Sequence, residues 1–394
     1  MALRTYQANI VKKMMWSYSL PGNDVVVLAQ GGGKTHIIAE FVKQLDEPVL
    51  ILVPNKELLE QDLDKLSACV PASQIGVYSA SMNSKEVRKI TIATIQSACK
   101  HPEQFTHYKV AIIDECDLLN PKNLGGMYNQ FFRDIGNPKI YGLTGTPFRQ
   151  DIIYKRYPSG WIDSITTTKM IIRMKPFVWA RMLCVVNTKD LLDHGYLAPV
   201  VYHEHKIVGH EDIPTNKSQS DFDLEQLDEM IEKYYGEIAE YIIGLPHKSR
   251  LVFCGTIEQA NTLSALIPNS VVVTSETKKK ERERIVKSFK AGEIPAVLNV
   301  GIFTVGFDYP ELDCIVLLRP TRSLRLHCQI LGRVTRIAPG KTEGHVYDLV
   351  DNVKSLGQLA DIRIEKVDNK WNVTSPAYPQ GFHYAELYTY SRRK

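Results

Sequence analysis

A glycine-rich heptapeptide, Ala29-Gln30-Gly31-Gly32-Gly33-Lys34-Thr35, lies between an apolar run at residues 25–28 and a helix-competent stretch at residues 36–45. A strand, a glycine loop, a Lys-Thr pair and a helix, in this order, form the usual phosphate-binding loop. Glycines let the backbone curl so that its N–H groups face inward. The positive end of the following helix attracts the same anion. The segment therefore predicts a phosphate site at the end of a strand.

Within this loop the residue types fit a nucleoside triphosphate with its metal. Gly31, Gly32 and Gly33 are expected to cradle the phosphates, Lys34 to reach the β- and γ-phosphates, and Thr35 to offer its hydroxyl to Mg²⁺. Leu28 stands where the general pattern has its first glycine. An ordinary strand-to-helix turn with a solvated lysine is the alternative.

Composition and length limit the class of protein. The 394 residues suffice for two domains, and the net charge of +4 permits a polyanionic partner without requiring one. Seven scattered cysteines include no Cys-x-x-Cys pair, which favours a reducing compartment over a zinc or disulfide framework. No apolar run approaches 18 residues. We therefore expect a cytoplasmic protein without a membrane partner.

The first half alternates short apolar strands with helical stretches. Candidate strands lie at residues 49–53, 75–78, 90–93, 110–113 and 139–143. This alternation predicts a parallel, doubly wound α/β sheet, whose functional groups gather beyond the carboxyl ends of its strands.

An acidic quartet, Asp114-Glu115-Cys116-Asp117, directly follows one of these strands. At that place Asp114 is expected to bind Mg²⁺, and Glu115 is expected to orient and deprotonate the water that attacks the γ-phosphate. An acidic helix N-cap is the alternative.

A second α/β series begins after residue 198, with candidate strands at 251–254, 270–273, 296–300 and 314–318. We expect domains at residues 1–197 and 198–394, with a site in the cleft between two similar lobes. The polar stretch 209–221 is predicted to be an exposed loop. Residues 151–197 interleave basic and aromatic side chains, which suits either a nucleic-acid strand or a solvated linker. The Tyr-rich tail, residues 361–394, shows no known specificity module.

Near the end of this series lies Gln329-x-x-Gly332-Arg333-x-x-Arg336. If the segment is helical, the spacing places Gln329, Arg333 and Arg336 on one face. Two arginines on one helix edge can act as arginine fingers on a γ-phosphate. A basic helix on a solvated face is the alternative.

These motifs, in this order, resemble those of superfamily 2 helicases and translocases of the DExD/H type. The resemblance covers residues 3–340 and implies two tandem RecA-like domains with ATP and Mg²⁺ in the cleft between the lobes. In the first half it assigns Arg4 and Gln7 to the adenine; from spacing alone, a surface residue on an amphipathic helix is the better explanation of Gln7. It assigns Pro54, Asn55, Thr94, Gln96 and Ser97 to the nucleic-acid backbone. Asp117, Thr144 and Thr146 would couple nucleotide state to the strand.

In the second half the same resemblance makes Arg333 and Arg336 the fingers and puts Gln329 near the attacking water. It places Gly306 and Asp308 at the nucleotide, with Asp308 toward the ribose, and Thr304 at the nucleic acid.

The resemblance implies an ATP-hydrolysing DNA helicase or translocase that moves 3′→5′. It is nearest to restriction-enzyme motor subunits and phage branch-migration helicases, which suggests forked or branched DNA and a phage origin. An RNA-dependent ATPase of the same superfamily is one alternative. An ATP-gated nucleic-acid clamp or sensor that separates no strands is the other.

Overall fold

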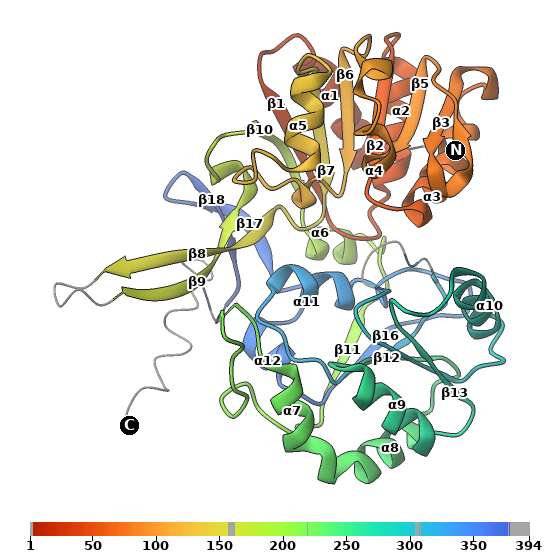
Figure 1. Ribbon diagram of the computed structural model, residues 1–394, viewed down its shortest axis with the longest axis vertical. Helices are drawn as coiled ribbons and strands as arrows, with labels where there is room; N and C mark the ends of the chain where they lie inside the picture. Colours follow the sequence, from red (N-terminus) through yellow and green to blue (C-terminus); the bar gives the residue numbers. More distant parts are fainter. Residues whose placement is uncertain are drawn as a thin grey trace. The chain divides into compact units, whose positions relative to one another are not determined.

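The computed structural model describes residues 3–156, 162–218, 220–303, 307, 309–376 and 378. The chain forms two compact units (Figure 1): unit 1 comprises Met1–Arg149 and Lys169–Asn187, and unit 2 comprises Gln150–Thr168 and Thr188–Lys394. The chain thus leaves unit 1, returns to it for one segment and leaves again. From the sequence we expected one boundary, at residues 197–198, and no return of the chain to the first domain.

Unit 1 is built on an eight-stranded sheet in the order β10-β1-β7-β6-β2-β5-β3-β4. Its elements are α1 (Thr5–Ser17), β1 (Asn23–Leu28), α2 (Lys34–Gln44), β2 (Val49–Val53), α3 (Lys56–Ser67), β3 (Ile75–Ser79), β4 (Ser84–Lys85), β5 (Ile90–Thr94), α4 (Ile95–Ala98), β6 (Val110–Asp114), α5 (Met127–Asp134), β7 (Lys139–Thr144) and β10 (Trp179–Val186). The neighbouring strands are parallel, except for the antiparallel pair β3 and β4. The predicted parallel α/β sheet is therefore confirmed.

Apolar side chains bury this sheet on both faces. Strands β2, β5 and β6 are buried along their full length, as expected for a parallel sheet flanked by helices. Helix α2 packs between α1 and α3, and α4 packs against α5.

Unit 2 holds a second parallel sheet, with six strands in the order β11-β16-β15-β12-β14-β13. Its elements, with two smaller strand pairs, are β8 (Phe148–Arg156), β9 (Ile162–Met170), α6 (Thr188–Asp193), β11 (Val200–Glu204), α7 (Leu224–Ile231), α8 (Tyr235–Gly244), β12 (Arg250–Phe253), α9 (Ile257–Leu266), β13 (Ser270–Val273), α10 (Lys279–Lys290), β14 (Ala296–Asn299), β15 (Cys314–Leu317), α11 (Leu324–Leu331), β16 (Gly344–Asp348), α12 (Asn352–Leu356), β17 (Arg363–Val367) and β18 (Lys370–Thr374). The second α/β lobe is thereby confirmed. Strands β17 and β18 form an antiparallel hairpin within residues 361–394, the segment described from the sequence as a Tyr-rich tail.

The stretch 209–221 is not simply an exposed loop, and that prediction is wrong for its anchored parts. His210 and Ile213 are buried, and His210 Nε2 lies 2.9 Å from Asn352 Oδ1. At the other end, Asp221 accepts a hydrogen bond from the backbone N–H of Arg322 at 2.8 Å. Polar side chains in this stretch form hydrogen bonds with buried groups of the protein instead of with water. A hydropathy pattern does not distinguish these two cases.

All seven cysteines are free thiols. Within the part of the chain that the structure describes, no helix has both the length and the hydrophobicity needed to cross a bilayer.

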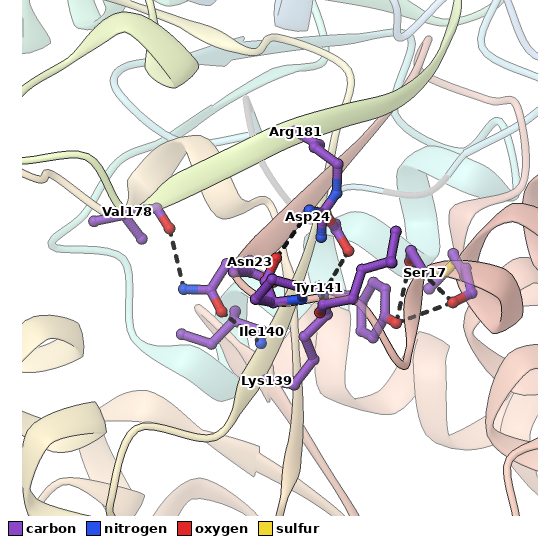
Figure 2. Close-up of polar contacts among 12 residues, drawn as sticks. Ser17, Asn23, Asp24, Lys139, Ile140, Tyr141, Val178 and Arg181 are labelled. Carbon is purple, nitrogen blue, oxygen red and sulfur yellow. Dashed lines mark hydrogen bonds and ion pairs between the residues drawn. The ribbon is translucent and has the colours of Figure 1, made fainter.

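The returning strand β10 is fastened to unit 1 by a buried carboxylate (Figure 2). Asp24 on β1 is fully buried and lies 2.7 Å from Lys139 Nζ on β7 and 2.8 Å from Arg181 Nε on β10. Next to it, Asn23 donates to the carbonyl of Val178 at 3.0 Å. Asp24 therefore links three adjacent strands at the end of β1 that is opposite the glycine loop.

Replacing Asp24 with Asn leaves two partly buried cations without their carboxylate. Breaking a buried pair in this way costs about 3–5 kcal/mol of unfolding free energy. We expect a clearly lower urea midpoint for unit 1, followed by circular dichroism and tryptophan fluorescence. Asp46→Asn is the matched control, because Asp46 pairs with Lys89 at a site where its own side chain is 96% exposed. Equal midpoints for the two variants would contradict the fastening role of Asp24.

Candidate functional site

Three of the predicted motifs meet at one edge of the unit 1 sheet. The glycine loop follows β1, the acidic quartet continues from β6, and Thr144 ends β7, which lies between those two strands. Since the strands are parallel, their carboxyl ends share this edge. The topology therefore brings together segments more than 80 residues apart in sequence.

The glycine loop has a backbone that side chains would obstruct. Gly33 has a φ of 83°, in the left-handed region that favours glycine. A Cβ on Gly32 would lie 2.6 Å from Leu28 Cδ1, which is too close without movement of the Leu28 side chain. Leu28, which occupies the place of the missing first glycine, therefore fills the space under the loop, so that a larger residue at position 32 requires the Leu28 side chain to move.

Lys34 and Glu115 form an ion pair in this site, with Lys34 Nζ 2.6 Å from Glu115 Oε1. Burial disfavours the charged ammonium, but Glu115 and Asp114 outweigh it and raise the pKa of Lys34 above its usual range. Lys34 is consequently a permanent cation, placed where the resemblance puts the phosphates.

The backbone of Glu115 is unusual. Its φ of 55° and ψ of 51° lie in the left-handed region, although the residue carries a side chain. Such a conformation costs roughly 1–3 kcal/mol and persists where the surroundings hold it, often at functional sites. The turn aims Glu115 at Lys34 directly after β6.

The site contains oxygen groups that suit Mg²⁺. Thr35 Oγ1 donates a hydrogen bond to Asp62 Oδ1 at 2.7 Å. Asp114 is buried, and its Oδ1 has no hydrogen-bond partner among the described residues. Burial raises the pKa of Asp114 well above its usual range, and the charge of Asp62 adds to this rise. A bound cation would give Asp114 Oδ1 a partner, and it would compensate the charge of this buried carboxylate.

No three described His, Cys, Asp or Glu side chains are grouped so that they could hold a metal ion alone.

The segment predicted to bind adenine is hydrogen-bonded to the phosphate loop. Gln7 is buried, and its Nε2 donates to the carbonyl of Gly32 at 3.0 Å. Gln7 Oε1 accepts from the backbone N–H of Arg4 at 2.9 Å. Tyr6 O–H donates to the same Gly32 carbonyl at 2.6 Å. The first turn of α1 is thereby connected to the loop, so Gln7 is not a solvated surface residue.

The predicted coupling residues are in contact. Thr144 Oγ1 donates to Asp117 Oδ1 at 2.7 Å, and the backbone N–H of Thr146 donates to Thr144 Oγ1 at 3.0 Å. Arg149 donates to the carbonyl of Asp117. The end of β7 is therefore joined to the acidic quartet through buried hydrogen bonds.

The residues predicted to contact nucleic acid lie at the carboxyl ends of the adjacent strands β2 and β5. Gln96 is exposed and its Nε2 donates to the carbonyl of Pro54 at 2.9 Å, which joins the two segments. Asn55 caps α3 by accepting the N–H of Leu58. Thr94 is buried and donates to Ser97 Oγ at 2.9 Å.

In unit 2 the predicted helix through Arg336 is wrong. Helix α11 ends at Leu331, and Gly332 is its C-cap, so residues 332–335 form turns, Arg336 lies outside any helix, and the argument from one helix face does not hold. Gln329 and Arg333 are buried, and Arg333 Nη1 donates to the carbonyl of Phe307 at 2.5 Å. Thr304, Gly306 and Asp308 lie outside the described residues.

Sequence reasoning missed Asp62 and Arg149. Asp62 had a usable signal, since it occupies the apolar face of α3 with Leu58, Leu59 and Leu66. A carboxylate at such a position needs a partner in the fold.

Helix α11 also carries a buried histidine. His327 is 1% exposed, and its Nε2 lies 2.9 Å from the carbonyl of Gly357. Burial lowers the pKa of His327 to about 4. The imidazole is therefore neutral in the folded protein at pH 5–8.

Comparison with known proteins gives matches in both units. The family described as "Type III restriction enzyme, res subunit" matches residues 1–149, and "Helicase conserved C-terminal domain" matches residues 235–338. IRC3 of Saccharomyces cerevisiae is 28% identical over 93% of this chain and 54% of its own length. The "DNA 3'-5' translocase XPB2" of Sulfurisphaera tokodaii is 26% identical over 85% of this chain and 78% of its own.

Among solved structures, the Type ISP restriction-modification enzyme LlaBIII, bound to DNA, has the same fold. Its TM-score is 0.62 at 15% identity, over 89% of this chain and 28% of that chain. This chain therefore spans about half the length of IRC3 and a smaller part of LlaBIII.

The buried histidine predicts how the stability of unit 2 depends on pH. The unfolded state binds a proton below the ordinary histidine pKa of about 6.5, whereas the folded state resists it to about pH 4. The contribution of His327 to the free energy of unfolding is therefore fully present above pH 6.5 and is lost as the pH drops. The loss between pH 7.5 and 5 is on the order of 2 kcal/mol. We expect His327→Gln to lose that much less in urea titrations at the two pH values.

His194→Gln is the matched control, because His194 is exposed on unit 2. It should keep the pH dependence of the wild type. A His327→Gln variant with an unchanged pH dependence would contradict this origin of acid sensitivity.

Proposed function

Because the chain belongs to the superfamily 2 helicases of the DExD/H type, we propose that it is an ATP-dependent helicase or translocase that acts on DNA. The observation that carries the proposal is the group of Lys34, Thr35, Asp114 and Glu115 at one edge of the unit 1 sheet, beside a loop in which a side chain at Gly32 would collide with Leu28.

In this proposal the phosphate loop holds ATP through Gly31, Gly32, Gly33 and Lys34. Lys34 exchanges Glu115 for the β- and γ-phosphates, which are better charge partners because they carry more than one negative charge. Glu115 is thereby released to accept a proton from the attacking water. The ion pair thus keeps the catalytic base inactive until a triphosphate is bound.

Mg²⁺ would be held by the hydroxyl of Thr35 and by Asp114, directly or through water. When bound, the ion neutralises phosphate charge as the terminal bond breaks. Asp114 fits this place because its Oδ1 is buried without a partner among the described side chains.

From the family resemblance we assign Arg333 and Arg336 of unit 2 to the phosphates, Gln329 to the attacking water, and Gly306 with Asp308 to the nucleotide. We likewise assign Arg4 and Gln7 to the adenine, and Asp117, Thr144 and Thr146 to the coupling of hydrolysis to movement. The hydrogen bonds from Thr144 to Asp117 support the last of these assignments.

We place the nucleic acid at the segments that carry Pro54, Asn55, Thr94, Gln96 and Ser97, with Thr304 from unit 2. DNA is preferred because XPB2 is named a DNA 3'-5' translocase, and 3′→5′ movement is proposed by the same analogy. Side chains at these positions would contact the sugar-phosphate backbone of the nucleic acid, so the preference for particular base sequences should be small.

The first test is ATP turnover by the purified chain with single-stranded DNA, duplex DNA, four-way junction DNA or RNA of matched length. We expect DNA to stimulate turnover at least ~10-fold more than RNA, since binding energy from the strand is used to complete the site. Stronger stimulation by RNA would transfer the proposal to an RNA-dependent ATPase. Displacement of a labelled strand in the same reactions separates a motor from a clamp, which turns over ATP and releases no strand.

The second test is Glu115→Gln, which keeps the size of the side chain but removes the base. We expect DNA-stimulated turnover to fall at least ~10²-fold while a fluorescent ATP analogue still binds. Glu103→Gln is the matched control, because Glu103 is exposed on the same unit, and its turnover should equal that of the wild type. Turnover within threefold of wild type in Glu115→Gln would refute the assignment of the base.

A further inference from the structure

Asp62 is a carboxylate on the buried face of an amphipathic helix. Leu58, Leu59 and Leu66 of α3 point to the same interior, and Asp62 is 2% exposed. Burying a carboxylate is costly unless charges and hydrogen bonds compensate it. The position therefore requires a function or a partner.

One oxygen of Asp62 has such a partner. Thr35 Oγ1 donates its hydrogen to Asp62 Oδ1 at 2.7 Å. A hydroxyl has one hydrogen and two lone pairs, so donation to Asp62 leaves the lone pairs of Thr35 for a cation. The hydrogen bond consequently prepares Thr35 as a metal ligand and does not compete with that role.

The other carboxylate oxygen of Asp62, Oδ2, lacks a hydrogen-bond partner among the described residues. This oxygen is buried, and Asp114 Oδ1 is likewise buried without a partner among the residues that the structure describes. Buried polar atoms of this kind are uncommon and call for an explanation such as an ion or water. Two of them beside the same phosphate loop point to one common ligand.

The charge balance indicates the sign of that ligand. Asp62 interacts electrostatically with Lys34 and Glu115, and also with Asp114. When all three carboxylates are ionised, one ammonium among them leaves an excess of two negative charges, and burial, which raises the pKa of Asp62 and of Asp114, opposes that state unless a cation compensates it. A divalent cation compensates this excess, whereas a further phosphate group without a metal increases it.

We propose that Asp62 is a positioning residue for the Mg²⁺ that accompanies the nucleotide. Asp62 Oδ1 orients the hydroxyl of Thr35, and Asp62 Oδ2 accepts a hydrogen bond from a water in the hydration shell of the ion. Mg²⁺ suits this arrangement because it usually keeps several of its waters. The inference rests on the proposed nucleotide site and adds a residue from α3 to it.

The test compares Asp62→Asn with wild type. Asparagine keeps an oxygen that accepts the Thr35 hydrogen bond but removes the charge. The affinity for a fluorescent ADP analogue is measured in EDTA and across a Mg²⁺ titration, and Mn²⁺ binding in the presence of ADP is followed by electron paramagnetic resonance. We expect the metal concentration for half-maximal effect to rise ~10-fold or more, as for other residues that support metal ligands. Affinity in EDTA should stay within about twofold of wild type, because the phosphate loop itself is unchanged.

Asp64→Asn is the matched control, since Asp64 is exposed on the same helix and its replacement changes the net charge equally. It should bind metal and nucleotide as the wild type does. An unchanged or lower half-maximal Mg²⁺ concentration in Asp62→Asn overturns the inference. So does an equal loss of affinity in EDTA, which would mean that Asp62 only shapes the loop. A wild-type chain that binds no nucleotide would overturn the proposed function as well, so the two failures are distinguishable.

Discussion

The ion pair between Lys34 and Glu115 is the interaction on which the rest of the unit 1 site depends. It joins the helix that follows β1 to the turn that follows β6, and it compensates a largely desolvated ammonium, whose side chain is 12% exposed. The Glu115 partner of this pair has a left-handed backbone conformation. An isolated pair of this kind adds little stability, but under the proposed function it keeps a base and a cation in place for a ligand with more negative charge. The site is thus poised for a polyphosphate.

Much of this arrangement could be predicted from the sequence, because its determinants are local. Glycines at 31–33, the Lys-Thr pair and the acidic quartet each follow an apolar run, and parallel sheets collect such segments at one edge. The alternation of strands and helices likewise predicted both sheets. The family resemblance, and not the strand pattern, grouped Asp117 with Thr144, which are in contact because β6 and β7 are adjacent.

Other features depend on tertiary contacts that no local pattern encodes. The spacing of Gln329, Arg333 and Arg336 fits a helix, yet α11 ends at Leu331, where Gly332 caps it and Arg333 turns to the carbonyl of Phe307. The return of β10 to unit 1 depends on Asp24, whose two partners come from distant segments. The buried end of the 209–221 loop depends on Asn352 in the same way. In each case a polar side chain finds its partner far along the chain.

The polar groups on β2 and β5 bear on how the chain would hold a strand of DNA. The side chains of Asn55, Thr94 and Ser97 already make hydrogen bonds within unit 1, as a helix cap and as a buried hydroxyl pair. They therefore shape the surface more than they extend from it, while Gln96 remains exposed. A surface built in this way offers few side chains to read base edges, and phosphate contacts carry no sequence information. The internal hydrogen bonding of these segments thus favours a motor that is indifferent to sequence.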